Sequence, residues 1–181
     1  MPGEVGLWVL IFGEMLVFAT LFLTYLYYRG KEPTLFAASQ KELNQWTGLA
    51  LTLVLITGSF LVVLAVQAVQ RGLRRVARRL LLGAIGCGLA FSVLKIFDYR
   101  EKFRHRITPE TNTFYTLYFV LTGIHWFHLI LGLVALTVLY RLLRKPEPSD
   151  VQMILIEGSA CYWHMVDLIW IILFPLVYLI R

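Results

Sequence analysis

The sequence contains few charged residues and no segment with the composition of a soluble domain. Charged residues make up 15% of its 181 positions, whereas 59% are hydrophobic and the mean hydropathy is +0.71. A soluble domain of this length does not need so much apolar surface. The composition therefore argues against a soluble protein and predicts an integral membrane protein.

Cysteine is also scarce, and the two residues present are not arranged as a pair. Cys87 and Cys161 both lie in apolar runs, and neither belongs to a C-x-x-C motif. We interpret them as small core residues rather than as a disulfide or a metal pair. No basic segment precedes the first apolar run, so we do not expect a cleavable secretory signal.

Long apolar runs are what the sequence has in abundance. A helix needs about 20 residues to cross a bilayer, and apolar runs of that length are helices because barrel strands are about half as long and alternate. We predict an all-α integral membrane protein, a single transmembrane domain over residues 1–181 with five helices in a bundle. Their approximate ranges are 5–28, 46–70, 79–99, 113–140 and 151–180.

The segments between these runs are short and polar, and we read residues 29–45 and the basic stretch 71–79 as connections. Asn112 or Thr113 is the expected N-cap of the fourth helix, and Ser149 or Asp150 that of the fifth. Pro175 is expected to bend the end of the fifth helix.

The net charge of +6 is explained by basic loops that face lipid phosphates, without any nucleic acid partner. Lys and Arg are evenly divided between the two sides of the predicted topology. The densest cluster breaks the tie because it contains no acidic residue. This cluster consists of Arg71, Arg74, Arg75, Arg78 and Arg79. Because such a cluster resists translocation, we expect the N-terminus in the cytoplasm and Arg181 outside.

Ionisable residues inside the predicted helices are the most informative feature, since each costs roughly 2.5–3.5 kcal/mol on insertion scales. Lys95 and Asp98 are three residues apart and are expected to pair along one helix face. Glu157 precedes His164 by two turns and shares its face. The full set is Glu14, Lys95, Asp98, His125, His128, Glu157, His164 and Asp167.

Depth along the helices places Glu14, the two histidines of the fourth helix, and His164 with Asp167 in one buried layer. We interpret this layer chiefly as hydrogen bonds between helices, with a metal site or a proton relay as alternatives. His125 and His128 form an H-x-x-H pair, which is a weak metal signal without further ligands. They lie one turn apart on one helix and therefore do not ligate opposite faces of one haem.

Small residues indicate where helices approach one another closely. Gly132 lies one turn beyond His128, so the histidine face of the fourth helix is expected to point into the bundle. The other small residues in this role are Gly83, Gly86 and Gly88 in the third helix and Gly123 in the fourth.

Two segments carry a family resemblance. TGIHWFHLILG in the fourth predicted helix and EGSACYWHMVDLIWIILF in the fifth resemble characteristic segments of the cytochrome c oxidase subunit III family. GEMLVFATLF and LKIFDYREKFRHRITPETNTFYTLYFVLTG are similar to further segments of that family, in the same order. Full-length members have seven spans and this chain has five. Asp98 stands where longer members usually have Glu, and Met165 where they have Phe.

The resemblance implies a subunit without redox cofactors that packs beside the catalytic subunit of a haem–copper reductase. It implies binding of membrane phospholipid and support for assembly, stability and proton uptake, and it carries over the eight buried ionisable residues named above. The five spans look most like the NorE-type accessory subunit of bacterial nitric oxide reductase. That branch implies a bacterial inner membrane, in which the orientation expected from the arginine cluster puts the C-terminus in the periplasm. Either nitric oxide or oxygen is the expected substrate of the complex.

Two other classes of function compete with this one. A proton-conducting transporter or channel would use the buried layer of Glu, His and Asp, although five spans without a repeat are a poor transporter pattern. A membrane enzyme with a metal at the H-x-x-H pair would bind zinc or iron through His125.

Overall fold

A computed structural model describes residues 5–144 and 150–180, and within these ranges it contains helices and no strand. Five helices are long and apolar enough to cross a membrane, which confirms the predicted all-α class. The elements are α1 (Val5–Lys31), α2 (Pro33–Lys41), α3 (Gln45–Gln70), α4 (Arg74–Arg104), α5 (Thr113–Leu142), α6 (Asp150–Phe174) and the π-helical turn η1 (Pro175–Leu179).

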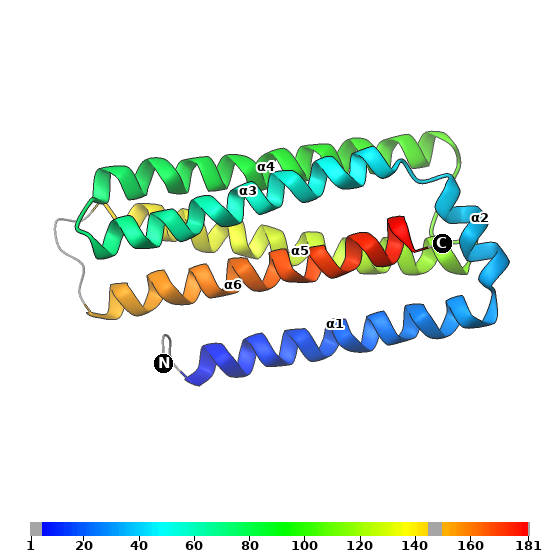
Figure 1. Cartoon of the computed structure of the whole chain (residues 1–181), viewed down its shortest axis with the longest axis horizontal. Helices are drawn as coiled ribbons and strands as arrows, with labels where there is room; N and C mark the ends of the chain where they lie inside the picture. The colour runs from blue at the N-terminus through cyan, green and yellow to red at the C-terminus, as the bar shows by residue number, and fades with distance from the viewer. Residues whose placement is uncertain (1–4, 145–149, 181) are drawn as a thin grey trace.

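The long helices lie roughly parallel to one another, and α6 lies in the middle (Figure 1). Helices α3 and α4 form the most extensive pair, α6 packs on both α3 and α5, and α1 packs more lightly on α5 and α6. In the most apolar stretch of α6, 61% of the residues are buried, compared with 11% in α1. Helix α6 is therefore the core of the bundle, and α1 is its periphery.

Helix α4 is longer than predicted at both ends. It includes Arg74, Arg75, Arg78 and Arg79, so the interpretation of residues 71–79 as a connection is wrong for most of that stretch. Arg and Ala are strong helix formers, so the helix starts before its apolar run begins. The turn itself is confined to Arg71–Leu73, where Gly72 adopts a φ of 74° that favours glycine.

A short helix, α2, replaces most of the predicted connection over residues 29–45. Pro33 occupies its first turn, where the missing N–H is not needed, and its buried side carries Phe36. The ring of Phe36 packs edge-on against Tyr25 of α1 and Phe114 of α5. Nine residues contain too few turns for apolar spacing to stand out in a sequence, and α2 is held by this packing instead.

Side-chain caps mark the starts of α3 and α5. Asn112 accepts a hydrogen bond from the backbone N–H of Tyr115 at 2.9 Å, so the first of the two predicted caps of α5 is correct. Asn44 caps α3 in the same way. Asp150 is the first residue of α6, and Ser149 lies outside the described residues.

The chain ends in a π-helical turn that begins at Pro175, where a bend was expected. Proline supplies no N–H to the helix ladder, and the wider turn leaves carbonyl groups that need donors. Gln40 Nε2 donates to the carbonyl oxygens of Leu176 at 3.3 Å and Val177 at 3.0 Å. Gln45 Nε2 donates to that of Tyr178 at 3.1 Å. Helix α2 and the start of α3 therefore close this end of the bundle.

Candidate functional site

The carboxyl group of Glu14 on α1 contacts an imidazole of α5. His128 Nε2 lies 2.9 Å from Glu14 Oε2, and Nδ1 of the same ring lies 2.8 Å from the carbonyl oxygen of Ile124. A carbonyl oxygen only accepts hydrogen bonds, so Nδ1 carries a proton and donates it. The contact between Nε2 and Glu14 then holds a second, shared proton. The pair exists either as a carboxylic acid and a neutral imidazole or as an ion pair, and both offset the desolvation of the two groups.

His125 is fully buried and serves a different contact. Its Nε2 lies 3.1 Å from the carbonyl oxygen of Val166 on α6 and therefore donates to it. The ring packs against Trp170 of α6 and Phe91 of α4. The H-x-x-H pair thus bonds two separate helices, one through each histidine.

His164 and Asp167 do not join the contact between Glu14 and His128. Nδ1 of His164 lies 2.5 Å from the hydroxyl oxygen of Ser59 on α3. Asp167 is 4% exposed, and neither of its carboxyl oxygens has a hydrogen-bond partner among the described residues. The residues of the expected buried layer therefore form separate contacts and no single network, and Asp167 has no hydrogen-bond partner among the described residues.

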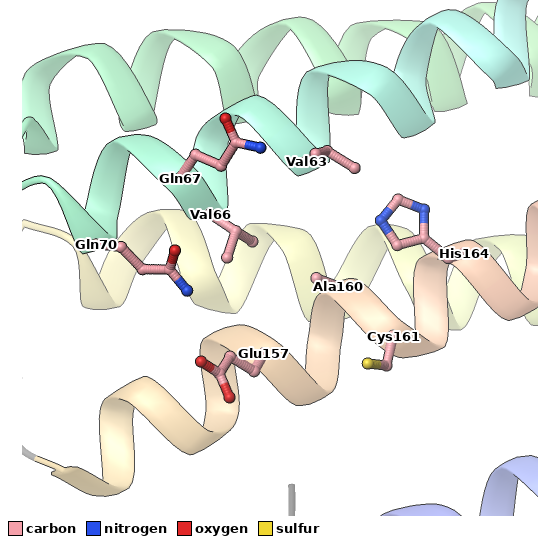
Figure 2. A pocket seen from close by; sticks show the side chains of 8 residues that line it. All are labelled: Val63, Val66, Gln67, Gln70, Glu157, Ala160, Cys161 and His164. Atoms are coloured by element: carbon pink, nitrogen blue, oxygen red, sulfur yellow. The ribbon is translucent and has the colours of Figure 1, made fainter. Parts of the chain in front are cut away.

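Glu157 and His164 both line a groove between α3 and α6, which agrees with the shared helix face expected from their two-turn spacing. The groove has a volume of about 300 Å³. Figure 2 shows Gln67, Gln70 and Glu157 along it, with His164 further along α6. Its other lining residues are Val63, Val66, Ala160 and Cys161.

The part of the chain that the structure describes contains no cluster of side chains suited to bind a metal ion. No group of three or more His, Cys, Asp or Glu side chains there is placed to hold a metal ion. His128 uses both ring nitrogens, one on a backbone oxygen and one on the Glu14 carboxyl group, and His125 uses Nε2 on a backbone oxygen. Cys87 and Cys161 are free thiols and form no disulfide.

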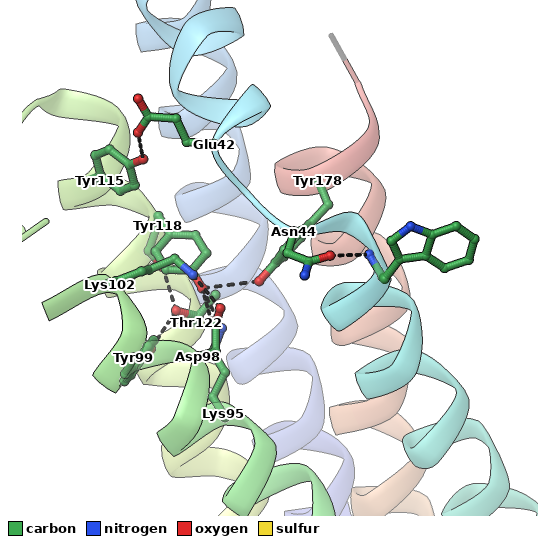
Figure 3. A network of polar contacts seen from close by, with 11 residues as sticks. Glu42, Asn44, Lys95, Asp98, Tyr99, Lys102, Tyr115, Tyr118, Thr122 and Tyr178 are labelled. Atoms are coloured by element: carbon green, nitrogen blue, oxygen red, sulfur yellow. Dashed lines mark hydrogen bonds and ion pairs between the residues drawn. The ribbon is translucent and has the colours of Figure 1, made fainter. Parts of the chain in front are cut away.

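Lys95 and Asp98 form the predicted ion pair along α4, and the structure adds three residues to it (Figure 3). Lys95 is fully buried, and its Nζ donates to Asp98 at 3.1 Å and to the hydroxyl oxygen of Tyr118 at 2.8 Å. The Tyr118 hydroxyl donates to Asp98 at 2.6 Å and lies 3.2 Å from that of Tyr178. Lys102 bonds the other carboxyl oxygen. One carboxylate therefore lies between two ammonium groups and balances one of their two positive charges.

The sequence interpretation missed Lys102, Tyr118 and Tyr178. The signal for Lys102 was present, because it follows Asp98 by four residues and so shares its helix face. Tyr118 and Tyr178 lie on α5 and η1, and no local spacing relates them to Asp98. Only the packing of the helices brings them together.

Trp163 of α6 is the residue around which the central helices meet. It is fully buried, and its ring lies against Gly88 of α4 and Gly132 of α5, with Gly58 of α3 close by. A Cβ atom at Gly88 would lie 2.9 Å from this ring, and one at Gly132 would lie 3.1 Å from it. Gly83, Gly88 and Gly132 lie at close helix contacts as predicted, whereas a Cβ atom would meet nothing within 4 Å at Gly86 and only the Tyr99 hydroxyl at 4.0 Å at Gly123.

The cluster of arginines lies at the end of the bundle that also holds the N-terminus, at the turn between α3 and α4 (Figure 1). Arg71 caps the end of α3, and the others occupy the first turns of α4. Arg78 donates to the Tyr140 hydroxyl at 3.3 Å, and its guanidinium lies 5.2 Å from the centre of that ring. Arg144 lies at the same distance from the same ring.

A second hollow lies where α1 meets α5 and α6. It has a volume of about 520 Å³, and Glu14, Ala135 and Tyr162 contribute to its lining together with apolar residues of α1. Gly158 of α6 lies against Leu7 of α1 at one end of it. The Glu14 carboxyl group is therefore both paired with His128 and accessible from this hollow.

Comparison with known proteins agrees with the resemblance found in the sequence. The model of the family described as cytochrome c oxidase subunit III matches residues 3–180. The cytochrome c oxidase subunit 3 of Corynebacterium diphtheriae is 30% identical over 98% of this chain and 88% of that protein. The cytochrome bo(3) ubiquinol oxidase subunit 3 of Buchnera aphidicola is 27% identical over 96% of this chain and 92% of that protein.

A third relative is a larger protein. The heme-copper oxidase subunit I+III of Aeropyrum pernix is 28% identical over 97% of this chain, which corresponds to 22% of that protein. The family match covers the segments that contain Glu14, the H-x-x-H pair and the Glu157–Asp167 stretch. The chain therefore belongs to the cytochrome c oxidase subunit III family.

Proposed function

We propose that this chain is a non-catalytic accessory subunit, without redox cofactors of its own, that packs in the membrane beside the catalytic subunit of a haem–copper reductase. The observation that carries the proposal is the Aeropyrum pernix relative, whose name combines subunits I and III. A chain that matches one segment of such a protein is suited to pack beside a separate subunit that corresponds to the remaining segment.

The geometry of the buried polar residues supports an accessory role. Glu14, His125 and His128 each bond a neighbouring helix, and Lys95 and Asp98 are neutralised within their own network. Groups held in this way fasten helices together and leave few ligands for a metal or haem. The same contacts support a role in the assembly and stability of the complex.

Co-purification tests this proposal directly. An affinity tag on the chain, extraction in a mild detergent and mass spectrometry should identify a haem–copper catalytic subunit as the main partner. The isolated chain should show no haem Soret band, whereas the complex should show one. A stoichiometric Soret band from the chain alone, or a partner of another class, would contradict the proposal.

We further propose the NorE-type branch of the family, in which the complex reduces nitric oxide. This assignment is supported by the number of spans and by the overall sequence resemblance. The relatives named above carry the names of cytochrome c, ubiquinol and heme-copper oxidase subunits, so the catalytic subunit that co-purifies decides between the two branches. Consumption of nitric oxide by the purified complex, measured beside its oxygen consumption, is the functional readout. Oxygen consumption alone would assign the chain to the oxidase branch.

The proposed location is the bacterial inner membrane, with the N-terminus and the Arg71–Arg79 cluster in the cytoplasm and Arg181 in the periplasm. The density of arginine at one end of the bundle supports this orientation. The guanidinium groups there are placed to contact phospholipid headgroups. A periplasm-dependent reporter such as alkaline phosphatase, fused after Arg181, should be active, and a cytoplasm-dependent reporter at the same position should not.

A further inference from the structure

Asp167 is the one acidic side chain of the bundle interior to which the contacts described above give no role. It is buried at 4% exposure, and both carboxyl oxygens lack hydrogen-bond partners among the described residues. An ionised carboxylate without a partner inside a membrane bundle is strongly disfavoured. The unpaired oxygens therefore indicate a carboxyl group that holds a proton or contacts water.

The neighbours of Asp167 form a short polar chain. His164 precedes it by one turn on the same face of α6, and Ser59 of α3 lies beside both side chains. Nδ1 of His164 bonds Ser59, and the other ring nitrogen has no partner among the described residues. Because His164 also lines the groove between α3 and α6, it connects the buried carboxyl group to that groove.

The groove continues toward the end of the bundle that carries the arginines. Helices α3 and α6 run in opposite directions, so Gln70 at the end of α3 lies near the start of α6 (Figure 2). From that end, the polar side chains follow in the order Gln70, then Gln67 with Glu157, then His164. Gln70 is followed directly by Arg71, so this end of the groove lies at the membrane surface.

Other titratable groups around α6 are already engaged or uncharged. On α5, His125 bonds the carbonyl oxygen of Val166, and on α1, Glu14 is paired with His128. On α4, Cys87 is the titratable group that faces Asp167. None of them supplies a cation to Asp167, which leaves His164 as its partner for a proton.

We propose that the groove between α3 and α6 is a water-filled path that ends at Asp167, and that Asp167 exchanges a proton through it with the side of the membrane that carries the Arg71–Arg79 cluster. When the carboxyl O–H bond breaks, the proton passes by way of Ser59 or water to a ring nitrogen of His164. It leaves the other ring nitrogen to water in the groove, and the reverse sequence returns it. This site is independent of which catalytic subunit the chain joins.

Infrared spectroscopy of the full chain in lipid vesicles tests the path. A carboxylic C=O band that disappears in Asp167→Asn identifies the protonated group, and transfer to D2O measures its rate of exchange. Ala160→Leu fills the groove and should slow the exchange of this band at least tenfold. Ala135→Leu adds the same volume to the hollow beside α1 and should leave it unchanged. Equal rates in the two variants, or the absence of an Asp167-dependent band, would overturn the proposal.

A second measurement does not depend on the folding of the Ala160 variant. Cys161 lines the groove, so in a Cys87→Ala background a charged, membrane-impermeant thiol reagent should reach it through water. The reaction should be at least tenfold faster from the side of the arginine cluster, and the modified protein should exchange the Asp167 proton more slowly. Equal reaction from both sides, no reaction, or unchanged exchange after modification would contradict the path.

Discussion

Asp98 is the residue on which the electrostatics depend at the end of the bundle that α2 and η1 close. It lies between Lys95 and Lys102, one turn away on either side, and it also accepts a hydrogen bond from Tyr118. Lys95 is fully buried, so its ammonium group relies on this carboxylate for neutralisation. A buried ion pair adds little net stability, but removing one partner leaves an uncompensated charge.

Replacing Asp98 with Asn should therefore destabilise the protein strongly. We expect a loss of about 3–5 kcal/mol, because Lys95 then remains buried without a counter-charge. Thermal unfolding in detergent, followed by circular dichroism, measures the effect. Glu101→Gln, which removes an exposed carboxylate from the same helix, is the matched control and should change stability very little. Similar melting of both variants would show that Lys95 does not need Asp98.

Glu14 and His128 are a second pair of residues whose contact is expected to stabilise the fold. Their contact joins α1 to α5, and we expect a coupling energy of about 1–2 kcal/mol between Glu14→Leu and His128→Phe. A double-mutant cycle on unfolding in detergent measures it. Strictly additive effects of the two substitutions would show that the contact contributes nothing.

Among the helices, close approach around Trp163 decides the packing. Gly88 and Gly132 allow α4 and α5 to reach the indole ring of α6, whereas Gly86 faces open space. Adding a methyl group at the first two positions forces the ring or its neighbours to move. The same methyl group at Gly86 meets nothing and benefits from the higher helix propensity of alanine.

Gly88→Ala should therefore destabilise the bundle by about 1–3 kcal/mol, through overpacking against Trp163 and Leu133. Gly86→Ala should be neutral or stabilising by up to about 1 kcal/mol. Both variants have the same composition and lie half a turn apart, so the difference between their unfolding temperatures isolates the contact. A stabilised Gly88→Ala protein would contradict the close approach.

Helix α2 stabilises the end of the chain through the hydrogen bonds of Gln40. This residue is fully buried and supplies the donors for two carbonyl groups of η1. Gln40→Leu leaves these carbonyls without partners, and we expect a loss of about 1–3 kcal/mol. Hydrogen exchange of the last turn should accelerate, whereas Lys41→Leu, at an exposed neighbour, should leave it unchanged. Unaltered hydrogen exchange in Gln40→Leu would mean that η1 is stable without the hydrogen bonds from Gln40.

For the whole molecule, the distribution of charge governs insertion. The arginines of α4 lie at the end of the bundle that holds the N-terminus, opposite the C-terminus (Figure 1). Replacing Arg74, Arg75, Arg78 and Arg79 with Gln removes the excess that resists translocation. A reporter fused to the C-terminus should then show mixed orientation, in place of a single one. The control is replacement of Arg100, Arg104 and Arg106 at the other end, which should preserve the original orientation.

The sequence alone determined the class of the protein, its five spanning helices and the local pair of Lys95 and Asp98. Apolar runs of this length have only one structure available in a membrane, and a spacing of three residues fixes neighbours on one helix face. The family assignment was also reached from the order of segments, and it is confirmed by the match over residues 3–180.

Only the tertiary structure decided which polar groups meet across helices. It paired Glu14 with His128, gave His125 a backbone partner, placed Ser59 against His164 and left Asp167 without a hydrogen bond. Depth along a helix is readable from residue number, but rotation about the helix axis and register against a neighbour are set by packing around side chains such as Trp163. A hydrogen bond tolerates errors of only a few tenths of an ångström, so these contacts follow from the packed bundle.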